Sequence, residues 1–146
     1  MAYRLLGLAV QREYGLFPLP EIRRSERGKP FFPDYPGLCF NLSHSRGAVV
    51  CALHDGPVGI DVERLRPAPR RLGAGRSDRE FFLAWTEGEA VIKRDGLDWR
   101  ALLTGMPADE RCRHLPELLP GWMVAVCPMK NGPIRCVRIE PEELER

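Results

Sequence analysis

Two acidic side chains, two positions apart, are the sharpest chemical signal in the sequence. They are Asp61 and Glu63, within the pentapeptide Gly-Ile-Asp-Val-Glu. On a β-strand alternate side chains point to the same face, so these carboxylates would share a face, about 6–7 Å apart along the backbone. Carboxylates that close repel each other unless a cation lies between them, and Mg²⁺ prefers such oxygen ligands. A strand with a solvated polar face is the alternative interpretation.

A second pair, Glu89 and Lys93, lies on a predicted helix. The two residues are four positions apart, so they share a face one turn from each other, and Trp85 lies one turn earlier. The alternative is an ordinary surface pair that contributes only about 0.3 kcal/mol. A helix with bulky aromatic residues is expected to dock on the rest of the protein. The pair would then lie at the rim of the docked face.

A third signal is the run Asn-Leu-Ser-His-Ser at 41–45. The Ser43 hydroxyl, the His44 imidazole and backbone N–H groups of a turn together suit a phosphate group. Lys29, in Gly-Lys-Pro, adds a positive charge upstream. For His44 alone, a turn histidine bonded to the backbone is the alternative interpretation.

Two helices and several short strands are predicted to position these groups. Apolar spacing favours a helix over 3–14, ended by Gly15, and a second over 78–95, capped by Ser77 or Asp78 and ended by Gly96. Turn residues separate five β-like runs, at 38–42, 48–53, 58–63, 122–127 and 134–139. Each half of the chain would be a helix followed by short strands, which hints at a pseudo-repeat.

The segment 64–79 differs in character, with six arginines among sixteen residues together with proline and glycine. Such a segment buries too little apolar surface to order itself, which predicts a mobile connector. It would serve either as a solvated linker or as a basic flap over a phosphate-rich ligand or an acidic partner.

Composition narrows the class of protein. A chain of 146 residues with 44% hydrophobic residues fits one domain or two small halves that share a core. The net charge of +2 predicts no general attraction to nucleic acid or to membranes. No apolar run reaches the roughly 20 residues that span a bilayer, and no signal peptide is evident, so a cytoplasmic location is expected.

The five cysteines are predicted to be structural rather than reactive. Their number is odd and no pair has C-x-x-C spacing. Cys39, Cys51 and Cys127 lie in apolar runs, where cysteine behaves as a small buried hydrophobe. We therefore expect neither a disulfide nor a zinc site nor a nucleophile.

The order of these motifs is more specific than any one of them. G-K-P, F-N-L-S-H-S, G-I-D-V-E and W-T-x-x-E-A-x-x-K follow one another and resemble the motifs of the surfactin-synthetase-activating type of 4'-phosphopantetheinyl transferase. The resemblance runs from residue 5 to the C-terminus. It implies an α+β fold of two pseudo-repeated halves, each a helix on a small antiparallel sheet. The halves would be 1–66 and 67–146, joined by the connector at about 64–79.

The resemblance also implies an activity and a site. The family transfers 4'-phosphopantetheine from coenzyme A to a serine of an acyl or peptidyl carrier protein, with Mg²⁺. The implied metal ligands are Asp61, Glu63 and Glu89; the implied catalytic residues are Glu89, Lys93 and Glu63; and the implied coenzyme A contacts are Lys29, Ser43, His44 and Arg4. Neither nucleic acid nor membrane is implied as a partner, and the oligomeric state is left open.

Three features depart from the family pattern. The chain begins almost at the first helix, with Tyr3 where the family has arginine and Arg4 beside it. The connector is short, and Gly88 replaces a lysine next to the catalytic glutamate, removing a phosphate contact. A non-catalytic module that binds coenzyme A or a carrier protein is therefore an alternative. A metal-dependent nuclease is a more distant alternative. The glutamate and lysine of a nuclease site are usually separated by one residue, whereas Glu89 and Lys93 are separated by three.

Overall fold

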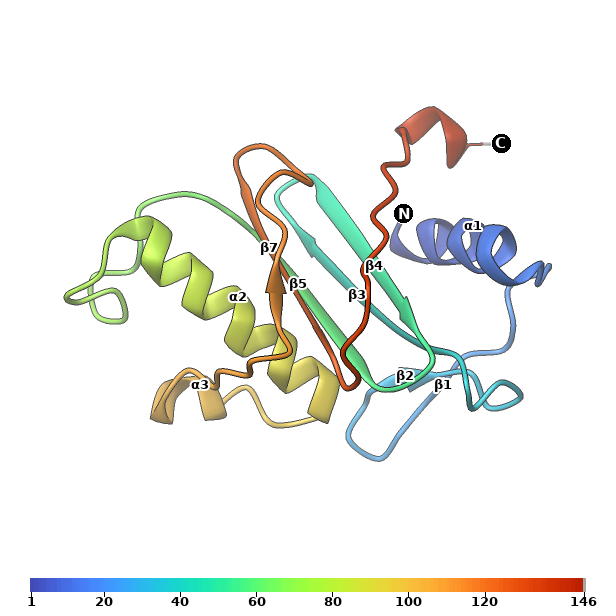
Figure 1. The fold of residues 1–146 in the computed structure, drawn as a ribbon, viewed down its shortest axis with the longest axis horizontal. Coiled ribbons are helices and arrows are strands. Elements are labelled where there is room, and N and C mark those ends of the chain that lie inside the picture. The colour runs from blue at the N-terminus through green and yellow to red at the C-terminus, as the bar shows by residue number, and fades with distance from the viewer. Residues whose placement is uncertain (146) are drawn as a thin grey trace.

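Two long helices flank a group of short antiparallel strands (Figure 1). The computed structural model describes residues 1–145. The elements follow the order α1 (Ala2–Tyr14), β1 (Arg23–Arg24), β2 (Pro30–Phe31), β3 (Cys39–Ser45), β4 (Ala48–His54), β5 (Val58–Arg64), α2 (Asp78–Asp95), α3 (Ala101–Thr104), β6 (Arg113–His114), β7 (Trp122–Pro128) and a final 3-10 turn, Pro141–Glu143. The expected α+β class is confirmed.

The strands form three small sheets. Strands β3 and β4 make an antiparallel hairpin, and β7 lies between β5 and β6 in an antiparallel sheet. Strands β1 and β2 form a two-residue ladder of their own. The inner faces of the hairpin and of β5–β7 meet in the largest apolar cluster, formed by Ala48, Val50, Ala52, Val58, Ile60, Val62, Val124 and Val126.

Helix α1 covers the other face of the hairpin. Leu6 and Val10, one turn apart, have no exposed surface and pack with Phe32 and Phe40. Gly15 ends the helix in the left-handed conformation, at φ 67°, which glycine adopts without steric cost. The predicted first helix is confirmed.

Helix α2 begins with a capping box and ends at a left-handed glycine. The Ser77 side chain accepts a hydrogen bond from the N–H of Glu80, whose carboxylate accepts one from the N–H of Ser77. Gly96 provides the C-cap at φ 64°. The helix lies directly on β5, because a Cβ at Gly59 would come within 1.8 Å of the carbonyl oxygen of Ala90.

Side chains of β3 complete the free edge of β5. Asn41 Oδ1 accepts a hydrogen bond from the N–H of Ile60 (2.8 Å), and Ser43 Oγ accepts one from the N–H of Val62 (3.4 Å). From the first contact to the second, the position moves forward by two residues on both strands. Strands β3 and β5 therefore run in the same direction, although no backbone ladder joins them. The hairpin is thereby joined to the second sheet, which orients Ser43 toward the acidic strand.

Two predictions about the C-terminal half are wrong. Residues 134–139 form no strand; the structure gives them an irregular path in which Ile134 and Val137 are 40% and 52% exposed. Their β-like composition does not make a strand here, because tertiary context decides short strands more than propensity does. The second error concerns the cysteines.

Cys112 and Cys127 form a disulfide. The β6–β7 register pairs Arg113 with Val126, so one step further Cys112 lies opposite Cys127, with the Cα atoms 4.1 Å apart. The chain turns back between 115 and 121, a fold that cysteine number and spacing do not reveal. Cys39, Cys51 and Cys136 are free, and the first two are half-buried.

The arginine-rich connector contains no helix or strand between β5 and α2. It is nevertheless attached to the start of α2, since the N–H of Ala68 donates to Asp78 Oδ1 (2.8 Å) and Ala68 packs on a cluster that includes Phe81 and Phe82. Its mobility and the domain boundary within it stay predictions. Within residues 1–145, no helix is long and apolar enough to cross a bilayer.

Candidate functional site

Helix α2 runs antiparallel to β5, and the predicted acidic and basic groups line the boundary between them. Gly59 lies against Ala90 and Arg94, and Lys93 contacts Ile60 and Asp61. Because alternate residues share a face, Gly59, Asp61 and Glu63 all point toward α2 while Ile60 and Val62 point into the apolar cluster.

Asp61 and Lys93 form the centre of the site. Lys93 Nζ lies 2.6 Å from Asp61 Oδ1, and also donates to Ser43 Oγ (3.1 Å) and to the carbonyl of Ile60 (3.3 Å). Ser43 in turn donates to Asp61 Oδ1 at 2.9 Å. The Asp61 side chain is only 6% exposed, so this ion pair is shielded from water.

The second carboxylate oxygen of Asp61 has no hydrogen-bond donor within residues 1–145 although it is buried. Burial raises the pKa of Asp61, and nearby Glu63 raises it further, while Lys93 and Ser43 lower it; the net direction is upward. A buried oxygen without a donor is an unusual feature of a folded protein, and it marks a place where a positive ligand would be stabilised.

Glu63 lies at the far end of β5 with partners of its own. Its Oε2 accepts hydrogen bonds from Ser45 Oγ (3.1 Å) and from Arg66 Nη1 (2.9 Å). The Arg66 guanidinium also lies over the ring of Phe82, 4.6 Å from the centroid. Glu63 is thus held at a fixed position on the side of the site next to the connector.

Glu89 lies one turn of α2 from Lys93 and faces the same strand. Burial raises its pKa, and the negative charges of Asp61 and Glu63 raise it further, against the effect of Lys93. Within residues 1–145 no hydrogen bond to its carboxylate is present. Three carboxylates from one strand and one helix therefore lie within electrostatic reach of each other, with a single lysine among them.

The carboxylates of this site suit a hard cation, although they are not arranged as a complete metal site. Within residues 1–145, no three His, Cys, Asp or Glu side chains lie close enough together to hold a metal as they stand. The oxygen of Asp61 without a donor and the carboxylate of Glu89 are nevertheless the ligands that Mg²⁺ takes, usually together with water and phosphate. The residues fit such an ion chemically.

The predicted coenzyme A contacts are not gathered at one point. Lys29 Nζ donates to the carbonyls of Arg94 (2.7 Å) and Val58 (3.4 Å) at the C-terminal end of α2, and burial lowers its pKa. Val58 is three residues before Asp61, which is about 10 Å along a strand. Ser43 is the one predicted coenzyme A contact that touches Asp61.

The other two predicted coenzyme A contacts, His44 and Arg4, lie away from Asp61. His44 is exposed and alternates with Ser43, so it points to the opposite face of β3. Arg4 is exposed on α1, which packs on the side of the hairpin away from β5. Position 88 also differs from the expectation, because a Cβ at Gly88 would meet Leu102 Cδ2 at 2.8 Å. It faces α3 rather than the acidic strand.

Ser45 and Arg66 are not among the site residues predicted from the sequence. Ser45 follows Ser43 by two positions, so strand alternation could have placed it opposite Glu63. Arg66 belongs to an arginine-rich segment in which no pattern distinguishes one arginine from its neighbours. Only the fold shows that it reaches Glu63.

Comparison with known proteins gives a consistent result. No family model matches the chain. The chain is 33% identical over 110 residues to the 4'-phosphopantetheinyl transferase Sfp of Bacillus subtilis (strain 168), covering 63% of this chain and 49% of Sfp. It is 36% identical over 105 residues to the 4'-phosphopantetheinyl transferase AcpT of Salmonella typhi, covering 58% of this chain and 55% of AcpT.

A shorter match joins the chain to the 4'-phosphopantetheinyl transferase psf-1 of Bacillus pumilus, 36% identical over 85 residues. The chain spans about half the length of the first two relatives. The resemblance that its ordered motifs indicate is confirmed: this chain is related in sequence to the 4'-phosphopantetheinyl transferases.

Proposed function

We propose that this chain carries a Mg²⁺-dependent 4'-phosphopantetheinyl transferase site. It would transfer 4'-phosphopantetheine from coenzyme A to a serine of an acyl or peptidyl carrier protein and release adenosine 3',5'-bisphosphate. The observation that supports this most is the convergence of Asp61 and Glu63 from β5 with Glu89 and Lys93 from α2. The relationship to named transferases supports the type of reaction.

The three carboxylates are the groups that would hold Mg²⁺. The Asp61 oxygen without a donor and the Glu89 carboxylate are available to a cation, while Glu63 is already held by Ser45 and Arg66. When bound, Mg²⁺ neutralises pyrophosphate charge and aligns the group to be transferred. Lys93 can remain on the first oxygen of Asp61, because the second is the one left open.

Glu89 is the best placed general base. Within residues 1–145 its carboxylate engages in no hydrogen bond, so an oxygen that does not bind Mg²⁺ would be open to the serine proton. Glu63 Oε2 is already engaged by two donors, Ser45 and Arg66. Glu89 would accept the proton of the carrier serine as its oxygen attacks phosphorus.

Lys93 and Lys29 would meet the phosphates. The ammonium of Lys93 already lies between Asp61 and Ser43 and could neutralise the departing phosphate. Lys29 would have to exchange backbone carbonyls of Arg94 and Val58 for a coenzyme A phosphate. We propose His44 and Arg4 as more peripheral contacts, because neither lies beside Asp61 in the fold. The pseudo-repeated halves and a cytoplasmic location belong to the same proposal.

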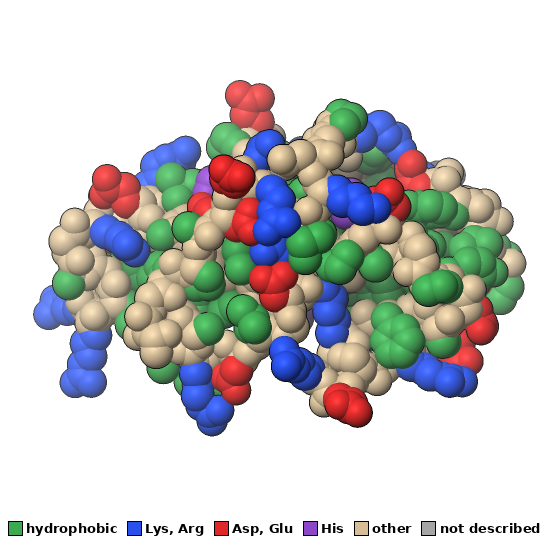
Figure 2. Space-filling view, turned by 60° about the horizontal axis from the view of Figure 1, so that its bottom comes forward, with side chains coloured by type: hydrophobic (Ala, Val, Ile, Leu, Met, Phe, Trp, Pro, Cys, Tyr) green, Lys and Arg blue, Asp and Glu red, His purple; other side chains and the backbone are tan. Residues whose placement is uncertain are grey.

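The two alternatives have less support. A non-catalytic coenzyme A-binding module would not need a glutamate with a raised pKa beside two further carboxylates. A nuclease needs a basic surface for the phosphate backbone. Figure 2 shows positive and negative side chains interspersed on the face it presents, with no broad basic area.

The test is transfer of phosphopantetheine measured by intact mass. The protein is incubated with coenzyme A, Mg²⁺ and several apo carrier proteins, and the carrier is expected to gain the mass of one phosphopantetheine arm. Asp61→Asn and Glu89→Gln should each lower the rate about 100-fold or more. Asp55→Asn and Glu117→Gln, exposed carboxylates outside the site, are the matched controls and should retain the rate.

The outcomes separate the alternatives. Binding of coenzyme A by calorimetry without transfer to any carrier would favour the non-catalytic module. Mg²⁺-dependent cleavage of plasmid DNA would favour the nuclease. Transfer that survives both Asp61→Asn and Glu89→Gln would contradict the proposed site, even if the protein proved to be a transferase.

A further inference from the structure

The Cys112–Cys127 disulfide lies between α2 and the β5–β7 sheet, one strand over from Asp61, because Cys127 pairs with Gly59 and Ala125 with Asp61. It packs in the cluster formed by Ala90, Val91, Ala125 and Cys127, with Cys112 alongside. Glu89 and Lys93 project from the opposite side of the same helical turns, toward β5. Helix α2 therefore contacts the candidate site along β5 and the disulfide along β7, on the same face of the sheet.

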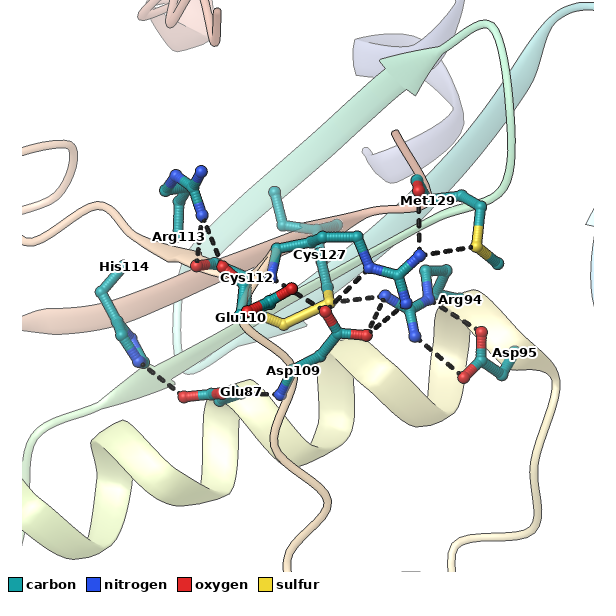
Figure 3. Close-up of a disulfide and its surroundings, with 12 residues drawn as sticks. Glu87, Arg94, Asp95, Asp109, Glu110, Cys112, Arg113, His114, Cys127 and Met129 are labelled. Carbon is teal, nitrogen blue, oxygen red and sulfur yellow. Dashed lines mark hydrogen bonds and ion pairs between the residues drawn. A yellow bond between two sulfur atoms is a disulfide. The ribbon is translucent and has the colours of Figure 1, made fainter. Parts of the chain in front are cut away.

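The segment that carries Cys112 has little other anchorage to the sheet. Strand β6 is only two residues long, Arg113–His114. Beyond that ladder, the N–H of Leu115 donates to the carbonyl of Val124 (2.9 Å) and Arg111 Nη1 to the carbonyl of Met129 (3.0 Å). Two contacts run to Glu87 of α2: the N–H of Asp109 donates to it (3.1 Å), and His114 Nε2 lies 3.2 Å from its Oε2. Figure 3 shows both contacts meeting at Glu87, to one side of the disulfide. The disulfide thus joins β7 to a segment that also contacts α2 at Glu87.

Arg94 links the sulfur atoms to this network. Its guanidinium is only 3% exposed and lies 3.1 Å from Cys127 Sγ and 2.9 Å from Asp109 Oδ2 (Figure 3). A second arginine, Arg111, lies 2.6 Å from Asp109. Arg111, and to a smaller extent Arg94, hold the pKa of Asp109 well below its usual range. A buried positive charge therefore lies beside one sulfur and not the other.

We propose that Cys112 and Cys127 form a reversible redox lock on α2. Oxidised, the pair fixes residues 109–114 to β7 and against the helix that carries Glu89 and Lys93; reduced, it releases that segment. Disulfides in reducing compartments are typically transient or sensing, so the expected cytoplasmic location favours a regulatory pair over a permanent one. The cytoplasmic location and the effect on transfer rest on the proposed function, whereas the response of the disulfide and of α2 to reduction does not.

The two sulfurs have different roles in reduction. Cys112 is partly exposed and Cys127 has no exposed surface, so a thiolate of a dithiol reductant attacks Cys112 Sγ. A new S–S bond joins Cys112 to the reductant, and the old bond breaks with its electron pair on Cys127. The Arg94 guanidinium stabilises that departing thiolate, which speeds the exchange.

The second thiol of the reductant completes the exchange. It attacks the reductant's own sulfur in the mixed disulfide and releases Cys112. The reductant leaves as a disulfide, having given up two electrons, and its two thiol protons are balanced by those taken up on Cys112 and Cys127. Burial raises the pKa of the Cys51 thiol to about 12, so Cys51 does not compete as a thiolate in this exchange.

The test begins with thiol counting on protein purified without reductant. Alkylation under denaturing conditions should modify the three free cysteines, Cys39, Cys51 and Cys136, and all five cysteines after dithiothreitol. Reduction should lower the melting temperature by about 5–10 °C. It should also speed amide hydrogen exchange in α2 and residues 109–114, but not in α1.

Variants assign these effects to the pair. Cys112→Ser should abolish the response to dithiothreitol, whereas Cys136→Ser, at an exposed free cysteine, should retain it. Arg94→Met should slow reduction about fivefold, and Arg111→Met, which loses contacts to Asp109 and Met129 instead, should not. If Arg94→Met fails to fold, the wild-type measurements decide the question.

Two results would overturn the lock: five alkylated cysteines before any reduction, or unchanged exchange in α2 after reduction. None of these measurements needs an active enzyme, so they stand apart from the transfer assay. If transfer is observed, the reduced protein should transfer several-fold more slowly than the oxidised protein. Equal rates in both states, with α2 exchange altered, would show that the lock does not control the proposed activity.

Discussion

The regions around α1 and α2 use similar elements for different purposes. Helix α1 rests on the β3–β4 hairpin through apolar side chains alone, with Leu6 and Val10 against Phe32 and Phe40. Helix α2 rests on β5 and β7 through small residues, at Gly59 and Ala125, and places its charged side chains at the edge of the contact.

The difference shows how a helix-on-sheet unit can become a site. A bulky apolar contact holds α1 at side-chain distance from its sheet, which leaves no room for polar groups. At Gly59 the backbone of β5 comes close to α2, so short and long polar side chains beside it reach each other, as Lys93 reaches Asp61. Close approach, rather than apolar area, defines the second region.

Glycine substitutions should show this contrast most strongly. Gly59→Ala places a Cβ 1.8 Å from the carbonyl oxygen of Ala90, a backbone atom that cannot move without the helix. We expect a loss of about 4 kcal/mol or more in the free energy of unfolding. In α1, Gly7→Ala meets only Leu19 Cβ at 3.9 Å, and should gain about 0.5–1 kcal/mol from helix propensity.

Urea denaturation followed by circular dichroism measures both changes. A small loss for Gly59→Ala would mean that α2 can move away from β5 at little cost. The explanation based on close approach would then be wrong, whatever the result for Gly7→Ala.

The next largest effect on stability is expected from a cavity in the apolar cluster under α1. Leu6→Ala removes a side chain with no exposed surface from the apolar cluster under α1, and should cost about 3 kcal/mol. Because this cluster has no contact with Asp61, the rate of phosphopantetheine transfer per folded molecule should be unchanged. A parallel loss of transfer activity would show that the two regions are coupled.

Much of this arrangement follows from the sequence. Apolar spacing and caps predict α1 and α2 nearly to the residue, and alternation in the pentapeptide places Asp61 and Glu63 on one face of β5. The spacing of Glu89 and Lys93 predicts their common face. These features are local, and local patterns determine them.

Contacts between distant segments could not be predicted in the same way. Nothing near Cys112 indicates that Cys127 lies opposite it, because the turn at 115–121 sets that register. The irregular, exposed path of 134–139 is set by tertiary context rather than by its β-like composition. Similarly, Gly88 faces α3 rather than the acidic strand β5, because residues 101–107 fold back on α2.

A smaller effect is expected from the pH dependence of stability. The pKa of Glu89 is raised above its ordinary 4.5, so the folded state binds more protons than the unfolded state between 4.5 and the raised value. Stability should therefore fall as pH rises through that window. Glu89→Gln removes this contribution, so its unfolding free energy should depend less on pH above 4.5 than that of the wild type.

Asp61 retains its own raised pKa in that variant, so part of the slope should remain. Glu117→Gln, at an exposed position, should leave the slope unchanged. Urea midpoints from pH 4 to pH 8 provide the measurement, and a steeper slope in Glu89→Gln would contradict the assignment.

The smallest expected effect is a difference in the stability contributed by two arginine–carboxylate pairs, one in the α1 region and one in the α2 region. Arg12 pairs with Glu143 across an exposed surface, with both side chains more than a third exposed. Arg66 pairs with Glu63 at 33% and 21% exposure and also covers the ring of Phe82. Arg12→Ala should cost less than about 0.5 kcal/mol, and Arg66→Ala about 1 kcal/mol, because the cation–π contact adds to the ion pair. Raising the salt concentration should weaken the Arg12 pair more than the Arg66 pair, since shielded charges are screened less. If both variants lost equal stability with equal salt dependence, Arg66 would be an ordinary surface residue, and Glu63 would not be held in place at the edge of the site.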